Sequence, residues 1–510
     1  MLTQPNSSSL WVPTEAVAFE PHHGDQRVDV VVVGAGLAGL TTAVLLARTG
    51  RQVVVLEGAR VGSGTTGRTT AKVSALQGLR YRTLVKRHGS DAAARYAAAQ
   101  LAGLAWMAEQ AAQDGVDCAW QRRTAYTYAT DATSARRVDE ELAAAQQADL
   151  PVERHRDVGL PFAELAVGLQ DQAQLDPYPY LLAMAEEVQR TPGCSVHEGS
   201  RVAAVHGHHR PSVRTESGTV RADHVVVATL LPITDRGLFF ARAEPKGSYT
   251  IVVRTREPLP DGMYLSADSP TRSLRAVTRD GQDLVLVGGN GHVVGRDHPT
   301  EPHYADLAAW AETAIGATEV VARWYAHDYL PVDHLPWVGP ATPASPNVLV
   351  AGGFEKWGMT GATSAALALH DRITGIGDGI SSAWAGLFDP MRLDPRSAAS
   401  GLRVNLEVGA QMVAGWAKPD AAAPSGRDGR RYRSGILPSG EAGSDADLTN
   451  GSVVCTHLGG PCAWNDAERT WDCPLHGSRF QAGGDVLTGP ATAPLHRRPA
   501  GNTDGSRAAS

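Results

Sequence analysis

Two short boxes near the end of the chain carry residue types that bind metals. Cys455 and His457 form a C-x-H box, and Cys473 and His476 form a C-x-x-H box. Four such ligands can hold zinc in a tetrahedral site. Zinc boxes usually pair like with like, whereas each box here supplies one Cys and one His, with 15 residues between His457 and Cys473. This pattern favours a [2Fe–2S] cluster, in which one iron takes two Cys and the other two His, with zinc as the alternative.

A glycine-rich turn near the N-terminus predicts a second kind of chemistry. Gly34, Gly36 and Gly39 form G-x-G-x-x-G between an apolar run and a helical pattern. The three glycines permit a tight turn, a close backbone approach to a pyrophosphate and close helix packing. Glu57 follows the next apolar run, 18 residues after Gly39, where it can accept a hydrogen bond from a ribose hydroxyl. The stretch therefore predicts a dinucleotide site.

FAD suits the rest of this region better than NAD. The fingerprint occurs once, and the small-residue run "GARVGSGTTGRTTAKVSALQG", with Thr66 and Thr70, can pass along an extended ligand. A second strand, glycine-rich turn and helix follow near residue 350, and the helix N-terminus can stabilise negative charge on a reduced flavin. The residues expected to contact FAD there are Gly353, Phe354, Gly358, Met359 and Thr360.

Residues 28–390 resemble the D-amino-acid-oxidase-like superfamily of FAD oxidoreductases. The resemblance rests on the fingerprint, on "DQAQLDPYPYLLAMAEEV", on "HVVVAT" and on "VDHLPWVG…AGGFEKWGMTGA". The tail, with "CTHLGG" and "WDCPLHGSRFQAGGDVLTGPATAPL", resembles Rieske [2Fe–2S] domains. Together, residues 28–495 resemble a bacterial family of FAD-dependent oxidoreductases with a C-terminal Rieske domain. This implies oxidation of a C–N bond by hydride transfer to flavin, and places the backbone near Val202 beside the adenine.

The same resemblance and the alternation of strands and helices predict the fold class. We expect an α/β FAD-binding Rossmann-like domain with an interleaved α+β substrate domain, followed by a small all-β Rieske-like domain. The expected order is a polar leader (1–27), the FAD oxidoreductase (28–395), a helix and linker (396–430), the Rieske domain (431–496) and a disordered tail (497–510). The FAD-binding parts are expected at about 28–90, 155–240 and 320–390, and the substrate-domain parts at about 91–154 and 241–319.

Three candidate catalytic residues are chosen because they lie in segments that are expected to run close to the flavin. Lys72 lies in the run expected to pass the flavin, and Lys356 precedes the closing helix, so either can polarise flavin or activate oxygen. His334 lies in the "PVDHLPWVG" segment expected near the flavin; a hydrogen-bonded turn residue is the alternative. For each lysine the alternative is a solvated or ion-paired side chain. Candidates for binding a substrate carboxylate are Arg254, Arg272, Tyr249 and Tyr264.

The tail departs from respiratory Rieske proteins in ways that bear on its potential. Those relatives carry a disulfide-forming Cys where Gly460 and Leu475 stand here, so Cys462 is expected to be a free thiol. They also often carry a Tyr at the position of Phe480, which has no hydroxyl to donate. We expect a potential in the lower part of the Rieske range of roughly −150 to +300 mV. The stretch before Cys455 has little strand alternation, which predicts an irregular β-scaffold under the cluster.

Charge and composition narrow the kinds of binding partner and cellular setting that we expect for this protein. A net charge of −7 and a pI near 6.2 disfavour a nucleic-acid partner, and no basic cluster suggests a membrane surface. Five cysteines in 510 residues suit a reducing, cytoplasmic setting. The uncharged run 30–47 predicts a buried strand, turn and helix rather than a membrane span.

A flavin takes two electrons at once and the cluster passes one at a time. We therefore expect a dehydrogenase or oxidase acting on a small amine or amino acid, with an electron-accepting or electron-donating protein as a partner. The alternatives are a Rieske-fed flavin reductase or monooxygenase, and a redox-sensing electron-transfer protein.

Overall fold

The computed structural model describes residues 9–12, 19–377, 379–392, 394–417, 429–434, 437–442 and 449–497. Much of the predicted leader, of the linker and of the tail lies outside these residues. The chain divides into two compact units. The first comprises Met1–Val293 and Glu301–Val404, and the second comprises Val294–Thr300 and Asn405–Ser510.

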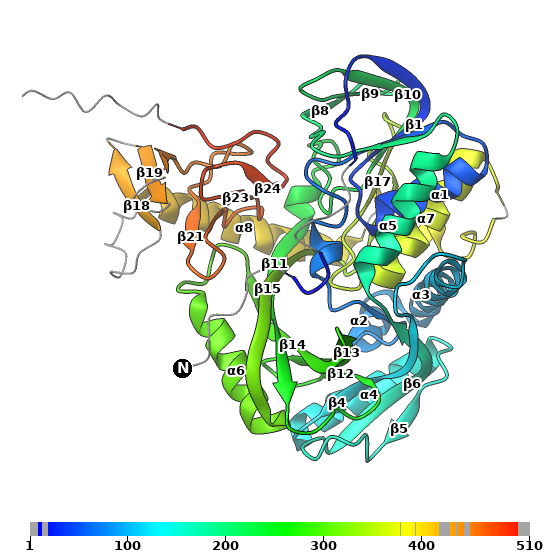
Figure 1. Ribbon diagram of the computed structural model, residues 1–510, viewed down its shortest axis with the longest axis vertical. Helices are drawn as coiled ribbons and strands as arrows, with labels where there is room; N and C mark the ends of the chain where they lie inside the picture. Colours follow the sequence, from blue (N-terminus) through cyan, green and yellow to red (C-terminus); the bar gives the residue numbers. More distant parts are fainter. Residues whose placement is uncertain are drawn as a thin grey trace, which may run out of the picture. The chain divides into compact units, whose positions relative to one another are not determined.

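An eight-stranded sheet with a parallel centre carries the dinucleotide turn (Figure 1). Its main path runs β16-β17-β10-β1-β2-β7, and β8 and β9 extend it from β10. Its strands are β1 (Gln26–Val33), β2 (Val53–Leu56), β7 (Ser195–His197), β8 (Ala204–His206), β9 (Ser212–Arg214), β10 (Thr219–Val227), β16 (Trp337–Pro340) and β17 (Val348–Gly352). The apolar runs of β1 and β2 are buried on both faces, as inner parallel strands require. Val30 and Val32 join one apolar cluster, and Val31 and Val33 join the other.

A nine-stranded, mostly antiparallel sheet forms the rest of the first unit. Its order is β15-β11-β14-β13-β12-β4-β6-β3, with β5 pairing to β6. The strands are β3 (Lys72–Val73), β4 (Gln121–Ala129), β5 (Glu153–His155), β6 (Leu165–Gln174), β11 (Ala243–Thr255), β12 (Met263–Ser266), β13 (Arg272–Arg279), β14 (Gln282–Val293) and β15 (Ala317–Pro331). Strands β3, β5, β6 and β15 therefore pair here, although their residues fall within or at the edge of ranges predicted as FAD-binding. The finer division of the chain stays a prediction.

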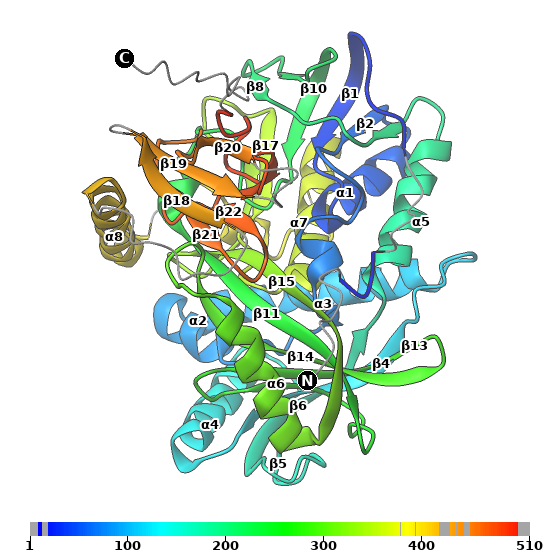
Figure 2. The ribbon, with the colours of Figure 1, turned by 60° about the vertical axis from the view of Figure 1, so that its left-hand side comes forward.

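Helices cover both sheets. α1 packs on α5 and α7 beside the eight-stranded sheet, α3 packs on α7, and α6 lies across β11, β14 and β15 (Figures 1 and 2). The helices of this unit are α1 (Leu37–Arg48), α2 (Arg80–His88), α3 (Ser90–Ala111), α4 (Ala132–Gln147), α5 (Pro177–Arg190), α6 (Glu301–Ile315) and α7 (Gly358–Thr374). Short 3₁₀ turns are η1 (Thr65–Arg68), η2 (Phe239–Arg242) and η3 (Ala385–Phe388). α8 (Pro395–Ala417) crosses the boundary between the two units.

Two small antiparallel sheets build the second unit. One has the order β18-β19-β20 and the other β21-β22-β23-β24. The strands are β18 (Gly429–Ser434), β19 (Leu437–Ala442), β20 (Thr449–Ser452), β21 (Ala463–Asn465), β22 (Thr470–Asp472), β23 (Arg479–Gln481) and β24 (Val486–Thr488). Three strands thus precede Cys455, so the β-scaffold is more regular than the sequence predicts. The alternation is hard to read because β18 and β19 are rich in Gly, Arg and Ser.

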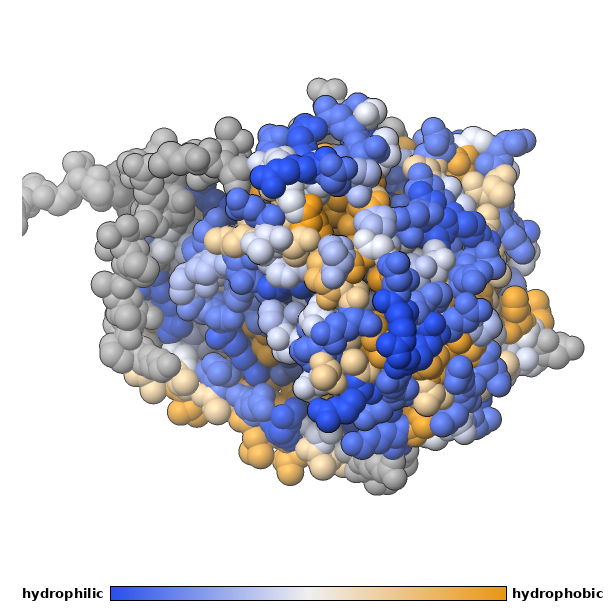
Figure 3. All heavy atoms as spheres, turned by 90° about the horizontal axis from the view of Figure 1, so that it is seen from below, coloured by the Kyte–Doolittle hydropathy of each residue, from blue (hydrophilic) through white to orange (hydrophobic). Residues whose placement is uncertain are grey.

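The run 30–47 forms the end of β1, the glycine turn and most of α1, as predicted. Among the helices that the structure describes, none has both the length and the apolarity needed to cross a bilayer. Hydrophilic residues cover most of the coloured surface in Figure 3, with apolar residues between them in small groups.

Candidate functional site

The glycine turn after β1 has the shape that the fingerprint predicts. Gly34 has φ +105°, and a Cβ there would lie 2.7 Å from the carbonyl oxygen of Ala228. A Cβ on Gly39 would overlap the carbonyl oxygen of Gly34, so only glycine lets α1 come this close to the turn. Gly36 precedes α1 without a side-chain cap, which leaves N–H groups of the first helical turn for an anion.

Glu57 and Thr66 border this turn. The Glu57 carboxylate follows β2 and accepts hydrogen bonds from the N–H groups of Ala35 and Ala59, both at 2.8 Å. Burial raises the pKa of Glu57, although these two N–H groups oppose the rise. Thr66, in η1, accepts from the N–H of Leu37 at 3.2 Å, so its hydroxyl lies at the start of α1.

Thr70 and Val202 contribute backbone rather than polar side-chain contacts. The carbonyl of Thr70 accepts from Arg275 Nη1 at 2.5 Å, which holds the run that follows η1. Val202 is buried among the apolar residues at the ends of β1 and β2. Their predicted contacts with FAD stay predictions.

A second strand–turn–helix lies at the end of β17. Gly353 has φ +75°, and a Cβ there would lie 2.7 Å from the ring of Pro331. Trp357 precedes α7 without a side-chain cap. Met359 and Thr360 are buried in the first turn of α7, and the Thr360 hydroxyl donates to the side-chain oxygen of Gln100 at 2.7 Å. Because that hydroxyl is engaged, the backbone N–H groups are what this helix start offers to a ligand.

These features together fit FAD. Two helix starts without side-chain caps can face negative charge, the first glycine turn admits a pyrophosphate, and a buried carboxylate follows β2. Two more residues are expected to contact it: Phe354, which follows Gly353 and has its ring against Gly361, and Gly358, the first residue of α7.

Lys356 is the predicted catalytic residue whose ammonium and backbone N–H both have polar partners on neighbouring strands. Its Nζ donates to the hydroxyl of Ser248 at 2.6 Å, and its backbone N–H donates to the carboxylate of Asp328. Burial lowers the pKa of Lys356, while Asp328 opposes that shift. Burial also raises the pKa of Asp328 to about 6. Lys246, which pairs with Glu244 at 2.6 Å, is directly opposite Asp328 in the sheet, so a second cation lies on the same face.

Glu355 points to a different set of partners. Its carboxylate accepts from the guanidinium of Arg80 and from Nδ1–H of His334, the latter at 2.9 Å. Burial by itself would raise the pKa of Glu355, but Arg80 and His334 hold that pKa below its usual value. A cavity of about 160 Å³ lies here, lined by Gln77, Leu79, Arg80, Thr83, His334, Glu355 and Trp357.

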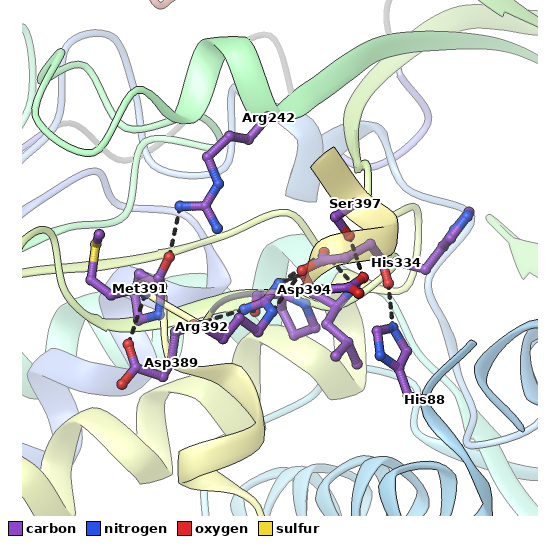
Figure 4. Close-up of polar contacts among 12 residues, drawn as sticks. His88, Arg242, His334, Asp389, Met391, Arg392, Asp394 and Ser397 are labelled. Carbon is purple, nitrogen blue, oxygen red and sulfur yellow. Dashed lines mark hydrogen bonds and ion pairs between the residues drawn. The ribbon is translucent and has the colours of Figure 1, made fainter. Parts of the chain in front are cut away.

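His334 itself sits in a fixed turn. It has φ +63°, and the preceding Asp333 is buried in an ion pair with Arg392 at 2.7 Å. Arg392 lowers the pKa of Asp333 against the effect of burial. The carbonyl of Asp333 is 2.7 Å from Nε2 of His88, and Arg242 donates to the carbonyl of Pro390 nearby (Figure 4). His334 is thus a hydrogen-bonded turn residue that also lines the cavity, and its catalytic role stays a prediction.

Lys72 belongs to another network. Its Nζ donates to the carbonyl of Tyr264 at 2.6 Å and to the hydroxyl of Ser273 at 2.7 Å. Burial, with a smaller effect of Arg275, lowers the pKa of Lys72 to about 7. The three predicted catalytic residues thus lie in three different sets of hydrogen bonds.

The four candidates for binding a substrate carboxylate are engaged elsewhere. Arg254 pairs with Glu319, and Arg272 pairs with Asp306, each at 2.7 Å. The Tyr249 hydroxyl lies 2.8 Å from Nε2 of His292. The Tyr264 hydroxyl donates to the carbonyl of Val158 at 3.0 Å.

The sequence did not predict Ser248, Lys246 and Asp328 as site residues, because single polar residues in long strands carry no distinctive spacing. It also missed Arg80 and Glu355, although Glu355 stands in the "GGFEKWG" turn.

The two metal-binding boxes of the second unit form matching loops. Gly459 N–H donates to the carbonyl of Cys455 at 3.0 Å, and Gly477 N–H donates to that of Cys473 at 3.1 Å. Each loop is thus closed four residues after its cysteine.

The side chains of these loops group by type. Hydrogen bonds from the thiols of Cys462 and Cys473 lower the pKa of Cys455 below its usual value. The rings of His457 and His476 lie with centroids 5.2 Å apart. In the part of the chain that the structure describes, no three Cys, His, Asp or Glu side chains converge as ligands of a single ion. A Cys pair and a His pair fit a two-iron cluster with two protein ligands per iron.

The structure also places the residues at which this chain differs from respiratory Rieske proteins. A Cβ on Gly460 would overlap the side chain of Leu475, so the two positions face each other. Cys462 is buried and forms no disulfide. Phe480 is fully buried in β23, opposite Trp471 of β22.

Comparisons with known proteins agree with both halves of the site. A family model described as FAD dependent oxidoreductase matches residues 29–372, and a model described as Rieske [2Fe-2S] domain matches residues 442–499. YhfW of Bacillus subtilis (strain 168), named as a Rieske 2Fe-2S iron-sulfur protein, is 31% identical over 492 residues, which cover 94% of this chain and 95% of YhfW.

Two solved structures share the fold of the first unit. Glycine oxidase from Geobacillus kaustophilus has a TM-score of 0.60 and 19% identity, covering 72% of this chain and 99% of its own. L-proline dehydrogenase from P. horikoshii has a TM-score of 0.59 and 16% identity, covering 73% of this chain and 98% of its own.

Proposed function

Because the chain belongs to the FAD-dependent oxidoreductase family and carries a C-terminal Rieske [2Fe-2S] domain, we propose that it oxidises a C–N bond of a small amine or amino acid. Its cofactors are FAD and a [2Fe-2S] cluster. Bound FAD would supply a two-electron acceptor for a hydride from the substrate carbon, and the cluster would supply a one-electron carrier towards an external acceptor. We favour amino acids, in line with the printed names of the two structural relatives, glycine oxidase and L-proline dehydrogenase.

The observation that supports an amino acid is the ammonium of Lys356, which belongs to an exposed residue of the closing turn and is directed by Ser248. A lysine has three donors, and the hydrogen bond to Ser248 uses one of them. Lys246 lies on the same face, where Glu244 balances its charge. We propose that Lys356 binds and orients the substrate carboxylate, with Ser248 fixing the direction of its side chain.

The neighbouring carboxylates hold this turn. Asp328 accepts from the N–H of Lys356, and Glu355 is held by Arg80 and His334. We assign Asp328, Glu355 and His334 to positioning the turn. Lys72 is assigned to joining β3 to β12 and β13 through its two hydrogen bonds.

For the cofactors, we propose these residues as the binding set. FAD would be held by the backbone at Gly34, Gly36, Gly39, Gly353, Phe354, Gly358, Met359 and Thr360, by Glu57 and Thr66, and by the chain at Thr70 and Val202. The cluster would be held by Cys455, His457, Cys473 and His476.

The test is an anaerobic screen of amines and amino acids against the full chain, recording the flavin bands optically and the cluster by EPR. We expect one substrate class to bleach the flavin and then to produce the reduced-cluster signal. A Cys455→Ser variant should still bleach its flavin but show no cluster signal. Reduction by a reduced ferredoxin alone would instead favour the Rieske-fed reductase, and no response to any member of the panel would favour the redox-sensing alternative.

A further inference from the structure

The second unit is built from two separate stretches of chain. The segment Val294–Thr300 lies between β14 and α6 in sequence, yet it belongs to the same compact unit as Asn405–Ser510. The cluster-binding unit therefore includes seven residues that lie more than a hundred positions before its main part.

The end of this segment is anchored to the turn that follows β21. Thr300 is almost fully buried, and its N–H donates to the carboxylate of Asp466 at 2.7 Å. Its hydroxyl lies 2.7 Å from the side-chain oxygen of Asn465 and accepts from the N–H of Ala467 at 3.1 Å. Three hydrogen bonds thus fix the segment on the second unit.

The beginning of the segment lies against the second cluster-binding loop. Gly295 has φ +70°, and a Cβ there would lie 2.8 Å from the backbone of both Asp472 and Pro474. Arg296 Nε donates to the carbonyl of Pro474 at 3.0 Å. Pro474 stands between Cys473 and His476, so the guanidinium contacts the peptide that joins the two proposed ligands of this loop.

The charge of Arg296 is only partly balanced. Its side chain is 13% exposed, and Nη1 lies 3.3 Å from the carboxylate of Glu407, which is 43% exposed. Reduction of a cluster adds one negative charge, and a buried cation beside a ligand loop favours the reduced form more than an exposed one does.

We propose that Arg296 is a positioning residue of the cluster site. It holds the Cys473–His476 loop through Pro474 and raises the reduction potential through its charge, while Glu407 lowers that potential. This inference rests on the cluster of the proposed function, but not on the substrate.

The test is a redox titration of the full chain followed by EPR, with iron and labile sulfide measured on every variant. Arg296→Gln should lower the equilibrium constant for cluster reduction at least tenfold, which is 59 mV for one electron. Arg296→Lys should restore part of the shift, because it keeps the charge. Glu407→Gln should shift the potential upwards and by less, because Glu407 is more exposed.

Arg497→Gln is the matched control. It removes one positive charge from the same unit at an exposed ion pair with Asp485, so its potential should stay close to that of the unmodified chain. Equal potentials for Arg296→Gln and Arg497→Gln would overturn the proposal.

If Arg296→Gln loads no cluster, the comparison of Arg296→Lys and Glu407→Gln decides. A downward shift or none in Glu407→Gln would then overturn the electrostatic part. An unmodified chain without iron would instead refute the proposed cluster itself, which separates the two failures.

Discussion

Replacing Lys356 tests the proposed substrate class directly. Lys356→Met keeps the length and apolar part of the side chain but removes the ammonium that donates to Ser248. If that ammonium binds a carboxylate, the variant should lose kcat/KM towards amino acids and keep it towards amines without a carboxylate.

The size of the loss follows from the setting of the side chain. A hydrogen bond involving charged groups contributes about 1.5–3 kcal/mol, so kcat/KM should fall roughly 10- to 150-fold. Lys356 is exposed, which favours the lower half of this range, because water can partly replace the missing donor. Ser248→Ala should lose less, since it removes only the group that directs the ammonium.

The assay compares matched pairs under anaerobic conditions by the rate of flavin bleaching. Glycine is compared with methylamine, and L-proline with pyrrolidine, which differ only by the carboxylate. Lys86→Met, at an exposed position of α2, is the control for loss of one positive charge. Equal losses for both members of a pair would refute carboxylate binding and would assign Lys356 to holding the closing turn.

Three further predictions concern the cofactors and the buried lysine. Phe480→Tyr should raise the cluster potential by about 40 mV, if its new hydroxyl contributes about 1 kcal/mol, and redox titration will show no change if the ring lies out of reach. Gly39→Ala should lower the flavin bound per chain while leaving iron content unchanged, because its Cβ would overlap Gly34; full flavin occupancy would contradict the close approach. Lys72 has a folded pKa of about 7, below the unfolded value near 10.5, so the unfolded state binds more protons between these values and stability rises with pH across that window. Lys72→Met should flatten this rise, by about 1.4 kcal/mol per pH unit at most, in denaturant unfolding at pH 7 to 10; an unchanged slope would show that Lys72 does not titrate there.

Local patterns predicted the elements that carry the cofactor motifs. α1 and α7 each follow a glycine turn and end just before a glycine, Gly50 and Gly375, so the signals that start and end these helices are local. α3 is rich in Ala, and α5 begins with Pro177 after its N-cap residue Asp176, so both helices also carry local signals. In these segments the information is local, so spacing alone is sufficient.

Partners far apart in sequence could not be predicted in this way. Lys72 stands in the flavin-binding run, but its ammonium is satisfied by β12 and β13, about 200 positions later. Lys356 depends on Ser248 and Asp328, and nothing in their strands marks them as partners. The segment Val294–Thr300 reads as an ordinary connection, and only its tertiary contacts assign it to the second unit.

The turn that precedes α7, with Glu355 and Lys356, combines a local backbone conformation with side-chain partners that are distant in sequence. Glu355 and Lys356 are consecutive non-glycine residues with φ +51° and +72°, a conformation that costs roughly 1–3 kcal/mol for each residue. Such a turn persists only if its surroundings determine it, and here the two side chains have separate partners: Arg80 and His334 hold Glu355, while Ser248 holds Lys356. Glycine at either position would relieve the strain but would also remove one of these anchors. Two charged residues in strained backbone are therefore what we expect if the turn serves to position the Lys356 ammonium, the role that we propose for it.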